Sequence, residues 1–220
     1  MKRVYLHAIR MSDKLPLQPE RIDGAHERIL NWVRKTPTVR IQGPGARPVI
    51  LKLECLQRSG SFKLRGALNK LMTLGEKARR GVITASGGNH GLGVTWAGWL
   101  LGVPVHVFVP ESTPSLKREA LERANAVVLV VRGRYPEAEA AAREMAEREG
   151  LSYIHAYDDP DIIAGQGTVT REFPEQEPDI QTLVVAIGGG GLAAGAVLAG
   201  GDRNIVGVEP HGAPTMYEAL

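Results

Sequence analysis

From Pro48 onward, short runs of valine, isoleucine and leucine alternate with segments whose apolar residues recur at helical spacing. Runs of this kind are typical of strands, and the segments between them predict helices. The expected strands are 49–53, 82–85, 105–109, 126–131, 152–155, 182–187 and 205–208. The expected helices are 63–74, 90–101, 114–124, 136–149, 159–173 and 192–198. This alternation predicts an α/β fold in which helices cover parallel sheets.

Three other segments refine this pattern. The run Val127–Val131 contains no polar residue, which fits a strand covered on both faces. Segment 19–35 is amphipathic at helical spacing, and Thr36-Pro37 is expected to end that helix because proline cannot continue it. Segment 42–48 has two glycines and two prolines and is expected to be a loop.

The composition is that of an ordinary globular chain of 220 residues. Its 27 basic residues barely exceed its 24 acidic ones, and no basic run indicates a nucleic-acid partner. No apolar stretch is long enough for a membrane span, and segment 1–14 is interpreted as a loose extension rather than a signal peptide. Cys55 is the only cysteine, which excludes an intrachain disulfide and fits a cytoplasmic protein.

The first candidate site is Ser-Gly-Ser-Phe-Lys-Leu-Arg-Gly-Ala at 59–67, between a predicted strand and a predicted helix. Its small residues would let the backbone approach a flat ligand, and Lys63 would supply the nitrogen of an imine with an aldehyde cofactor. The run also fits a plain helix start with Ser61 as the cap and Lys63 in solvent. On this run alone both interpretations stay open.

The second candidate site is Ser-Gly-Gly-Asn-His-Gly at 86–91, again where a strand leads into a helix. Free backbone N–H groups, a hydroxyl and an amide suit a carboxylate and a phenolic oxygen. The alternative is a tight turn whose residues tolerate positive φ. His90 has no second histidine, cysteine or carboxylate at metal-ligand spacing.

The third candidate site is the glycine run Gly188, Gly189, Gly190 and Gly191, which would present N–H donors to a phosphate at a helix start. It lacks the Lys-Ser/Thr of a Walker loop and does not match the spacing of a dinucleotide fingerprint. Each of the three runs follows a predicted strand, at the end where parallel sheets bind ligands. Together they predict one cofactor site.

These motifs, in this order, resemble the fold-type-II pyridoxal-phosphate (PLP) enzymes of the tryptophan synthase β-like class. Within that class the sequence is similar to the serine/threonine dehydratase family, which includes threonine deaminases and serine racemase-like enzymes. Further runs that carry the resemblance are Thr36-Pro37, Leu53-Glu54-Cys55-Leu56-Gln57, Ala164-Gly165-Gln166-Gly167-Thr168 and Gly207-Val208-Glu209-Pro210. The resemblance implies two parallel-sheet domains. The larger, PLP-binding one would comprise 1–80 plus 159–220 and be incomplete at its C-terminus, and the smaller one would comprise 81–158.

The resemblance also implies roles for residues. Lys63 would hold PLP as a Schiff base and take the Cα proton of the substrate. Phe62 would pack against the cofactor ring, Asn89 would bond to its 3′ oxygen, and Gly188 to Gly191 would hold its phosphate. The residues expected to receive the substrate carboxylate are Ser86, Gly88, Asn89 and His90.

The implied activity is PLP-dependent β-elimination of L-threonine or L-serine to a 2-keto acid and ammonia. Lys-Leu-Arg-Gly after Phe62 favours the dehydratases, because threonine synthases usually have aspartate in the second place. Serine racemases have a serine where this chain has Gly87, so we expect elimination to dominate. The alternatives are a serine/threonine racemase, a β-replacement enzyme, a catalytically incomplete PLP-binding fragment, or a phosphate-binding module that uses only the glycine run.

The chain departs from the family in two respects. The family normally continues further, with the group that meets the pyridine nitrogen, so apolar faces left uncovered would aggregate or bind a partner. Members with a metal site use a glutamate, a carbonyl four residues on and an acidic residue six on. Those positions are Glu209, Ala213 and Thr215 here, so no metal is expected and Glu209 is a lone candidate ligand. The expected partners are a small 3-hydroxy amino acid and further copies of the chain, as a dimer or tetramer, without nucleic acid or membrane.

Overall fold

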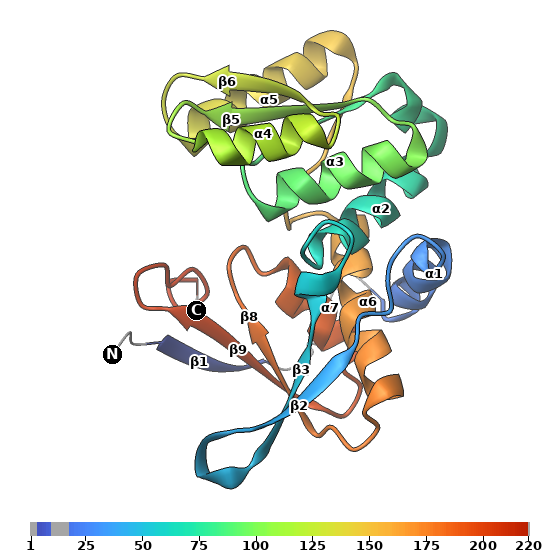
Figure 1. Ribbon diagram of the computed structural model, residues 1–220, viewed down its shortest axis with the longest axis vertical. Helices are drawn as coiled ribbons and strands as arrows, with labels where there is room; N and C mark the ends of the chain where they lie inside the picture. Colours follow the sequence, from blue (N-terminus) through green and yellow to red (C-terminus); the bar gives the residue numbers. More distant parts are fainter. Residues whose placement is uncertain (1–3, 10–17, 220) are drawn as a thin grey trace.

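The computed structural model describes residues 4–9 and 18–219. Figure 1 shows two parts, one above the other in this view, with α2 (Lys63–Leu74) between them. Each part is built around its own sheet.

The upper sheet has four parallel strands in the order β6-β5-β4-β7. Its strands are β4 (Val82–Ala85), β5 (Val105–Pro110), β6 (Val127–Val131) and β7 (Ser152–Tyr153). The helices that follow its first three strands are α3 (Asn89–Leu101), α4 (Ser115–Arg123) and α5 (Tyr135–Glu149). Successive strand residues face opposite sides, so Ile83 and Ala85 pack against α5 while Val82 faces the core on the α3 side.

The lower sheet is mixed, in the order β1-β9-β8. Strands β8 (Thr182–Ala186) and β9 (Asn204–Pro210) are parallel, and β1 (Val4–Ile9) is antiparallel to β9. The remaining elements are α1 (Glu20–Ile29), the hairpin β2 (Thr38–Gln42) and β3 (Pro48–Lys52), α6 (Pro160–Gln176), α7 (Gly191–Ala199), and the 3-10 turns η1 (Pro44–Ala46), η2 (Glu54–Leu56) and η3 (Gly75–Arg80). In the described part of the chain no helix is both long and apolar enough to cross a membrane.

The predicted α/β class is confirmed, and each strand and helix expected after residue 48 is present with boundaries shifted by a few residues at most. The expected loop 42–48 is the turn of the β2–β3 hairpin, whose first strand the apolar pattern did not indicate.

Three expectations are wrong. Residues 4–9 are not a loose extension but strand β1, which pairs with β9 at the far end of the sequence, whereas 1–3 and 10–14 lie outside the described residues. Strand β6 is an edge strand, so Val127 and Val130 are each 51% exposed rather than covered. Helix α1 ends at Ile29 and does not extend to residue 35. Trp32 and Val33 lie in the turn that follows, and they pack on the same core as Ile29, which is why the apolar spacing continues beyond the helix.

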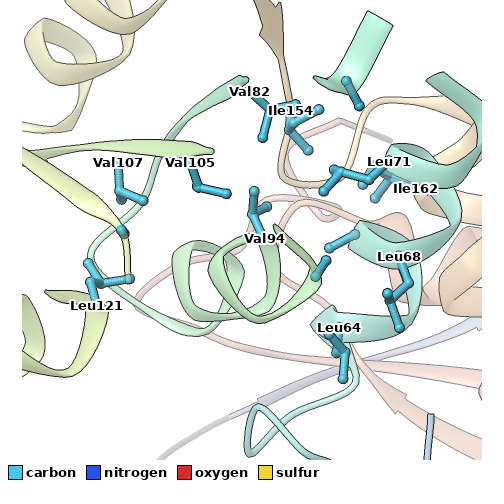
Figure 2. Packing of buried hydrophobic residues seen from close by; sticks show 14 of the residues in the cluster. Leu64, Leu68, Leu71, Val82, Val94, Val105, Val107, Leu121, Ile154 and Ile162 are labelled. Carbon is cyan, nitrogen blue, oxygen red and sulfur yellow. The ribbon is translucent and has the colours of Figure 1, made fainter. Parts of the chain in front are cut away.

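The main core lies where α2 meets α3 and the upper sheet (Figure 2). Leu64, Leu68 and Leu71 recur about once per turn, so they form one apolar face of α2. Val94 of α3 and Ile154, just after β7, belong to the same fully buried cluster. This packing fixes the first turn of α2, which begins at Lys63.

Two glycines of α6 let three helices pack backbone to backbone. A Cβ on Gly165 would lie 2.5 Å from Gly66 Cα and 2.6 Å from the carbonyl oxygen of Arg65, both on α2. A Cβ on Gly167 would lie 3.0 Å from the carbonyl oxygen of Gly195 on α7. The Ala-Gly-Gln-Gly-Thr run of 164–168 therefore sets the distance of α2 and α7 from α6.

Gly165→Ala should lower the free energy of unfolding by about 1–3 kcal/mol, because the added methyl group overlaps the backbone of α2. Gly24→Ala on α1 is the matched control, since a Cβ there meets nothing within 4 Å. That variant should gain about 0.5–1 kcal/mol from the better helix propensity of alanine. Urea unfolding followed by circular dichroism measures both, and effects of the same sign would contradict the packing account.

Candidate functional site

Lys63 opens α2 and is turned away from bulk solvent. Its Nζ donates a hydrogen bond of 2.7 Å to the carbonyl of Ala156 and lies 5.4 Å from the centroid of the Phe62 ring. Burial lowers the pKa of Lys63 to about 8. Ser61 does not cap the helix, and its buried Oγ finds no partner among the described residues. The interpretation of this run as a plain helix start with a solvated lysine is therefore wrong.

The three predicted runs meet around segment 154–157, which follows β7. The carbonyl of Ile154 faces His90 Nε2 at 3.2 Å, and the carbonyl of Ala156 accepts from Lys63. The next residue, Tyr157, lies against the glycine run, because a Cβ on Gly189 would overlap its ring. The residue types of this segment do not indicate a site, since every residue has a backbone carbonyl.

His90 is a neutral hydrogen-bond acceptor at its free nitrogen. Nε2 must carry the proton because a carbonyl oxygen, that of Ile154, is its partner. Burial and then the charge of Lys63 lower the pKa of His90 to about 3, so the imidazole stays neutral near pH 7. Nδ1 is buried, without a partner in the described part of the chain, and offers only a lone pair. A carboxylate at this site would therefore bond to the backbone N–H of His90, not to its ring.

The glycines of 86–91 are required by close packing against neighbouring groups and not by positive φ angles. Neither Gly87 nor Gly88 has positive φ, so the tight-turn alternative is wrong in that form. A Cβ on Gly87 would lie 2.7 Å from Thr113 Cγ2, and a Cβ on Gly91 would overlap the carbonyl of Ser86. The Ser86 hydroxyl accepts from Gly88 N at 3.3 Å.

The start of α3 is suited to an anion. Its cap residue Gly88 makes no side-chain cap bond, and the first N–H groups of a helix have no partner inside it. The helix dipole adds positive potential at this end. Asn89, the first residue of α3, is exposed and free to turn toward a ligand.

The glycine run forms the start of α7. Gly190 is its cap with φ +86°, a left-handed conformation that glycine adopts without strain. A Cβ on Gly188 or Gly190 would meet nothing within 4 Å, so both face open space. Open space at a helix start suits a phosphate, and Thr215 Oγ1 donates to the Gly188 carbonyl at 2.6 Å.

A buried ion cluster anchors α2. The guanidinium of Arg65, fully buried, donates to the carboxylates of Glu54 and Glu172 at 2.8 and 2.9 Å. Lys52 pairs with Glu172 at 2.5 Å. Arg65 belongs to the predicted run 59–67, but this role was not predicted for it. Two residues after Lys63, it holds the first turn of α2 against α6 and the η2 turn.

A cavity of about 850 Å³ adjoins the site. It lies between β3, α6 and β8, and its lining includes Phe62 and Leu192, which follows the glycine run. Its walls are mainly apolar, and Lys63 is not among the residues that line it. The Lys63 site and this cavity are therefore separate features, with Phe62 at their border.

Residues 29–220 match the family model described as pyridoxal-phosphate dependent enzyme. The chain belongs to this family of enzymes. An L-threonine ammonia-lyase from Geobacter sulfurreducens is 41% identical over 207 residues, 90% of this chain and 52% of that protein. A serine racemase from Arabidopsis thaliana is 36% identical over 200 residues, 87% of this chain and 60% of that protein.

The solved structure of maize serine racemase is similar to this chain with a TM-score of 0.81 and 34% identity, over 84% of this chain and 57% of that one. The chain spans about half the length of the curated relatives it matches. The predicted family is confirmed, and the cofactor of the family is pyridoxal phosphate, as predicted.

The residues present fit this cofactor. An aldehyde needs an amine, and Lys63 offers one whose lowered pKa increases the fraction in the neutral form. The phosphate needs N–H donors in open space, which the start of α7 provides. Buried polar atoms without partners among the described residues, Ser61 Oγ and His90 Nδ1, also indicate a site built for a ligand. In the same part of the chain no group of three or more His, Cys, Asp or Glu side chains is placed to hold a metal ion.

The rate at which Lys63 reacts with aldehydes should rise with pH and reach its midpoint near pH 8, because only the neutral amine attacks a carbonyl. Reductive labelling with pyridoxal phosphate and cyanoborohydride, read by peptide mass spectrometry, measures this rate. A short lysine peptide in the same tube is the control, with a midpoint of about 10.4. Equal midpoints for peptide and Lys63 would show that the amine is solvated.

Proposed function

We propose that this chain carries the cofactor-binding and substrate-binding part of a serine/threonine ammonia-lyase, which converts L-threonine or L-serine to a 2-keto acid and ammonia. The observation that carries the proposal is the position of Lys63. Its partly neutral amine faces segment 154–157, where the start of α3 and the glycine run also meet. The similarity to an L-threonine ammonia-lyase supports this reaction class.

Each part of the cofactor has a proposed partner in the site. Lys63 Nζ would hold its aldehyde carbon, and Phe62 would pack against its ring. Asn89 would bond to its 3′ oxygen, and Gly188 to Gly191 would bind its phosphate. When bound, pyridoxal phosphate stabilises negative charge at the Cα of an amino acid.

The substrate carboxylate is proposed to bind at the start of α3. The Ser86 hydroxyl would donate to it, together with the N–H groups of Asn89 and His90. The N–H of Gly88 would join them by exchanging its long bond to Ser86 Oγ for one to the carboxylate. Held there, the substrate would place its Cα–H bond within reach of Lys63, whose amine, replaced at the aldehyde carbon by the amine of the substrate, would be free to take the proton. The lowered pKa of Lys63 supports this role as a base. The β-hydroxyl would then leave as water with the proton that Lys63 has gained, and hydrolysis of the released enamine would give the 2-keto acid and ammonia.

The packing at Gly87 favours elimination over racemisation. A base on the opposite face of the substrate would need a side chain here, and the Thr113 side chain occupies the space of its Cβ. Thr113 is 8% exposed and β-branched, so it has little freedom to move aside. Serine racemases are nevertheless similar to this chain at nearly the same identity, which keeps racemisation as the second candidate.

Other features of the proposal concern the whole protein. We propose a larger domain of 1–80 plus 159–220 and a smaller domain of 81–158, a homo-oligomeric state and a cytoplasmic location. β-Replacement, a catalytically incomplete PLP-binding fragment and a phosphate-binding module are the competing functions. A panel of substrates and the cofactor-trapping experiment below separate them.

Lys63→Ala should lose both cofactor attachment and turnover. With pyridoxal phosphate and borohydride, the wild-type chain should gain the mass of one reduced cofactor, located at Lys63. With pyridoxal phosphate alone it should form 2-keto acid from L-threonine. Lys77→Ala, at an exposed position, is the matched control and should behave as the wild type. Attachment without turnover would favour the incomplete fragment, and turnover by Lys63→Ala would remove Lys63 from the mechanism.

Gly87→Ser should lower the free energy of unfolding by about 1–3 kcal/mol, because its side chain overlaps Thr113. Gly87→Ser combined with Thr113→Ala should recover that loss and release D-serine from L-serine, with Thr113→Ala alone as the control. Thermal melts and a chiral assay measure the two effects. A Gly87→Ser variant as stable as the wild type would refute the packing argument. Wild-type release of D-serine at a rate comparable to pyruvate would refute the preference for elimination.

A further inference from the structure

Glu209, on β9, is a fully buried carboxylate surrounded by protein donors. Its Oε1 accepts from His7 Nε2 and from Tyr217 N, both at 2.8 Å. Its Oε2 accepts from Met216 N at 2.9 Å and contacts Thr215 Oγ1 at 3.2 Å. An ionised carboxylate has about four acceptor sites. Three are filled by full hydrogen bonds, and the fourth faces the Thr215 hydroxyl.

The pKa of Glu209 agrees with a carboxylate that is held ionised. Burial alone would raise the pKa, but the N–H groups of Met216 and Tyr217 and the bond from His7 outweigh it and lower the pKa. The position six residues on is Thr215, which brings no second negative charge. A divalent cation needs several oxygen ligands, so this set of residues does not fit one.

Strand β1 is held at this place by more than His7. It pairs with β9 along its length, with His7 opposite Gly207. Its Tyr5 ring stacks on His211 at 4.0 Å and on Tyr217 at 4.2 Å between centroids. Strand β1 therefore contacts the segment that follows β9 through the Tyr5 ring. The carboxylate of Glu209 accepts hydrogen bonds from backbone N–H groups of the same segment.

The same cluster reaches the glycine run. A hydroxyl has one proton, and the shorter contact of Thr215 Oγ1, 2.6 Å, is to the carbonyl of Gly188. The contact of that oxygen with Glu209 is then the longer, weaker arm. Gly188 has no side chain through which the fold can hold it, so this bond fixes the first peptide of the run.

We propose that β1, through His7, takes the place of a divalent cation at Glu209, and that His7, Glu209 and Thr215 position Gly188 for phosphate binding. These three are positioning residues, since they would act on the phosphate through Gly188. The part that concerns phosphate rests on the proposed function. The part that concerns the cation stands on the contacts of Glu209 alone.

The first test compares variants in affinity for pyridoxal phosphate, measured by absorbance well below the melting temperature. Thr215→Val keeps the shape but loses the hydroxyl, and should weaken binding about fivefold, the effect of one net hydrogen bond. Thr215→Ser restores the donor and should bind as the wild type. His7→Phe should also weaken binding, whereas Leu6→Thr, at a 69% exposed position of β1, should not. Equal affinities for Thr215→Val and Thr215→Ser would overturn the positioning role.

The second test measures melting temperature with MgCl₂, CaCl₂ or EDTA and needs no cofactor. The wild-type chain should respond to none of them. Thr215→Asp combined with His7→Ala restores an acidic ligand and removes the competing donor, so its melting temperature should rise with Mg²⁺. Thr215→Asp alone should respond less. Stabilisation of the wild type by either cation would overturn the proposal that His7 takes the place of a cation at Glu209.

The two proposals fail in different ways. If pyridoxal phosphate and borohydride leave wild-type Lys63 unmodified, the proposed function fails. The change of melting temperature with cations still tests whether Glu209 binds one. If His7→Phe does not fold, the wild-type response and the pair Thr215→Val and Thr215→Ser still decide the inference. Attachment at Lys63 together with a wild-type cation response would overturn this inference and leave the proposed function intact.

Discussion

The hydrogen bond from Lys63 Nζ to the carbonyl of Ala156 joins the first turn of α2 to the segment that follows β7. This bond requires the first turn of α2 to lie close to that segment, and the packing of α2 against its neighbours on both sides fixes this position. On one side a Cβ on Gly93 would lie 3.0 Å from Lys63 Cβ, so α3 approaches to backbone contact. On the other side Arg65 binds Glu172 of α6. The amine is partly desolvated because these neighbours leave little room for water.

Most elements could be predicted from the sequence because their signals are local. The apolar runs of β4 and β5 and the spacing of Leu64, Leu68 and Leu71 are such signals. What could not be predicted depends on pairing over long distances. Strand β1 exists because β9 lies beside it, and the exposure of Val127 follows from the strand order. Neither property could be inferred from the residue types at those positions.

The candidate site shows the same division. Lys63, the 86–91 run and the glycine run could be located because small residues and a lysine at strand ends are distinctive. The carbonyls of Ile154 and Ala156, which bring the runs together, could not, since all residues carry a carbonyl. The state of His90 also depended on structure, because its partner Ile154 decides which ring nitrogen keeps the proton. The resemblance implied that His90 contacts the substrate carboxylate, and the fold leaves only its backbone N–H for that contact, because the free ring nitrogen is an acceptor.

The open edge of β8 has a consequence for the thermodynamics of the chain. Strand β8 pairs only with β9 in the described sheet, Val184 is 68% exposed, and the cavity of about 850 Å³ runs along it. The strand leads through Ile187 directly into the glycine run. A polypeptide that paired with this edge would lie one residue, Ile187, from the peptides proposed to bind phosphate. If such pairing changed the affinity of the glycine run for phosphate, phosphate would change the affinity of the edge by the same factor.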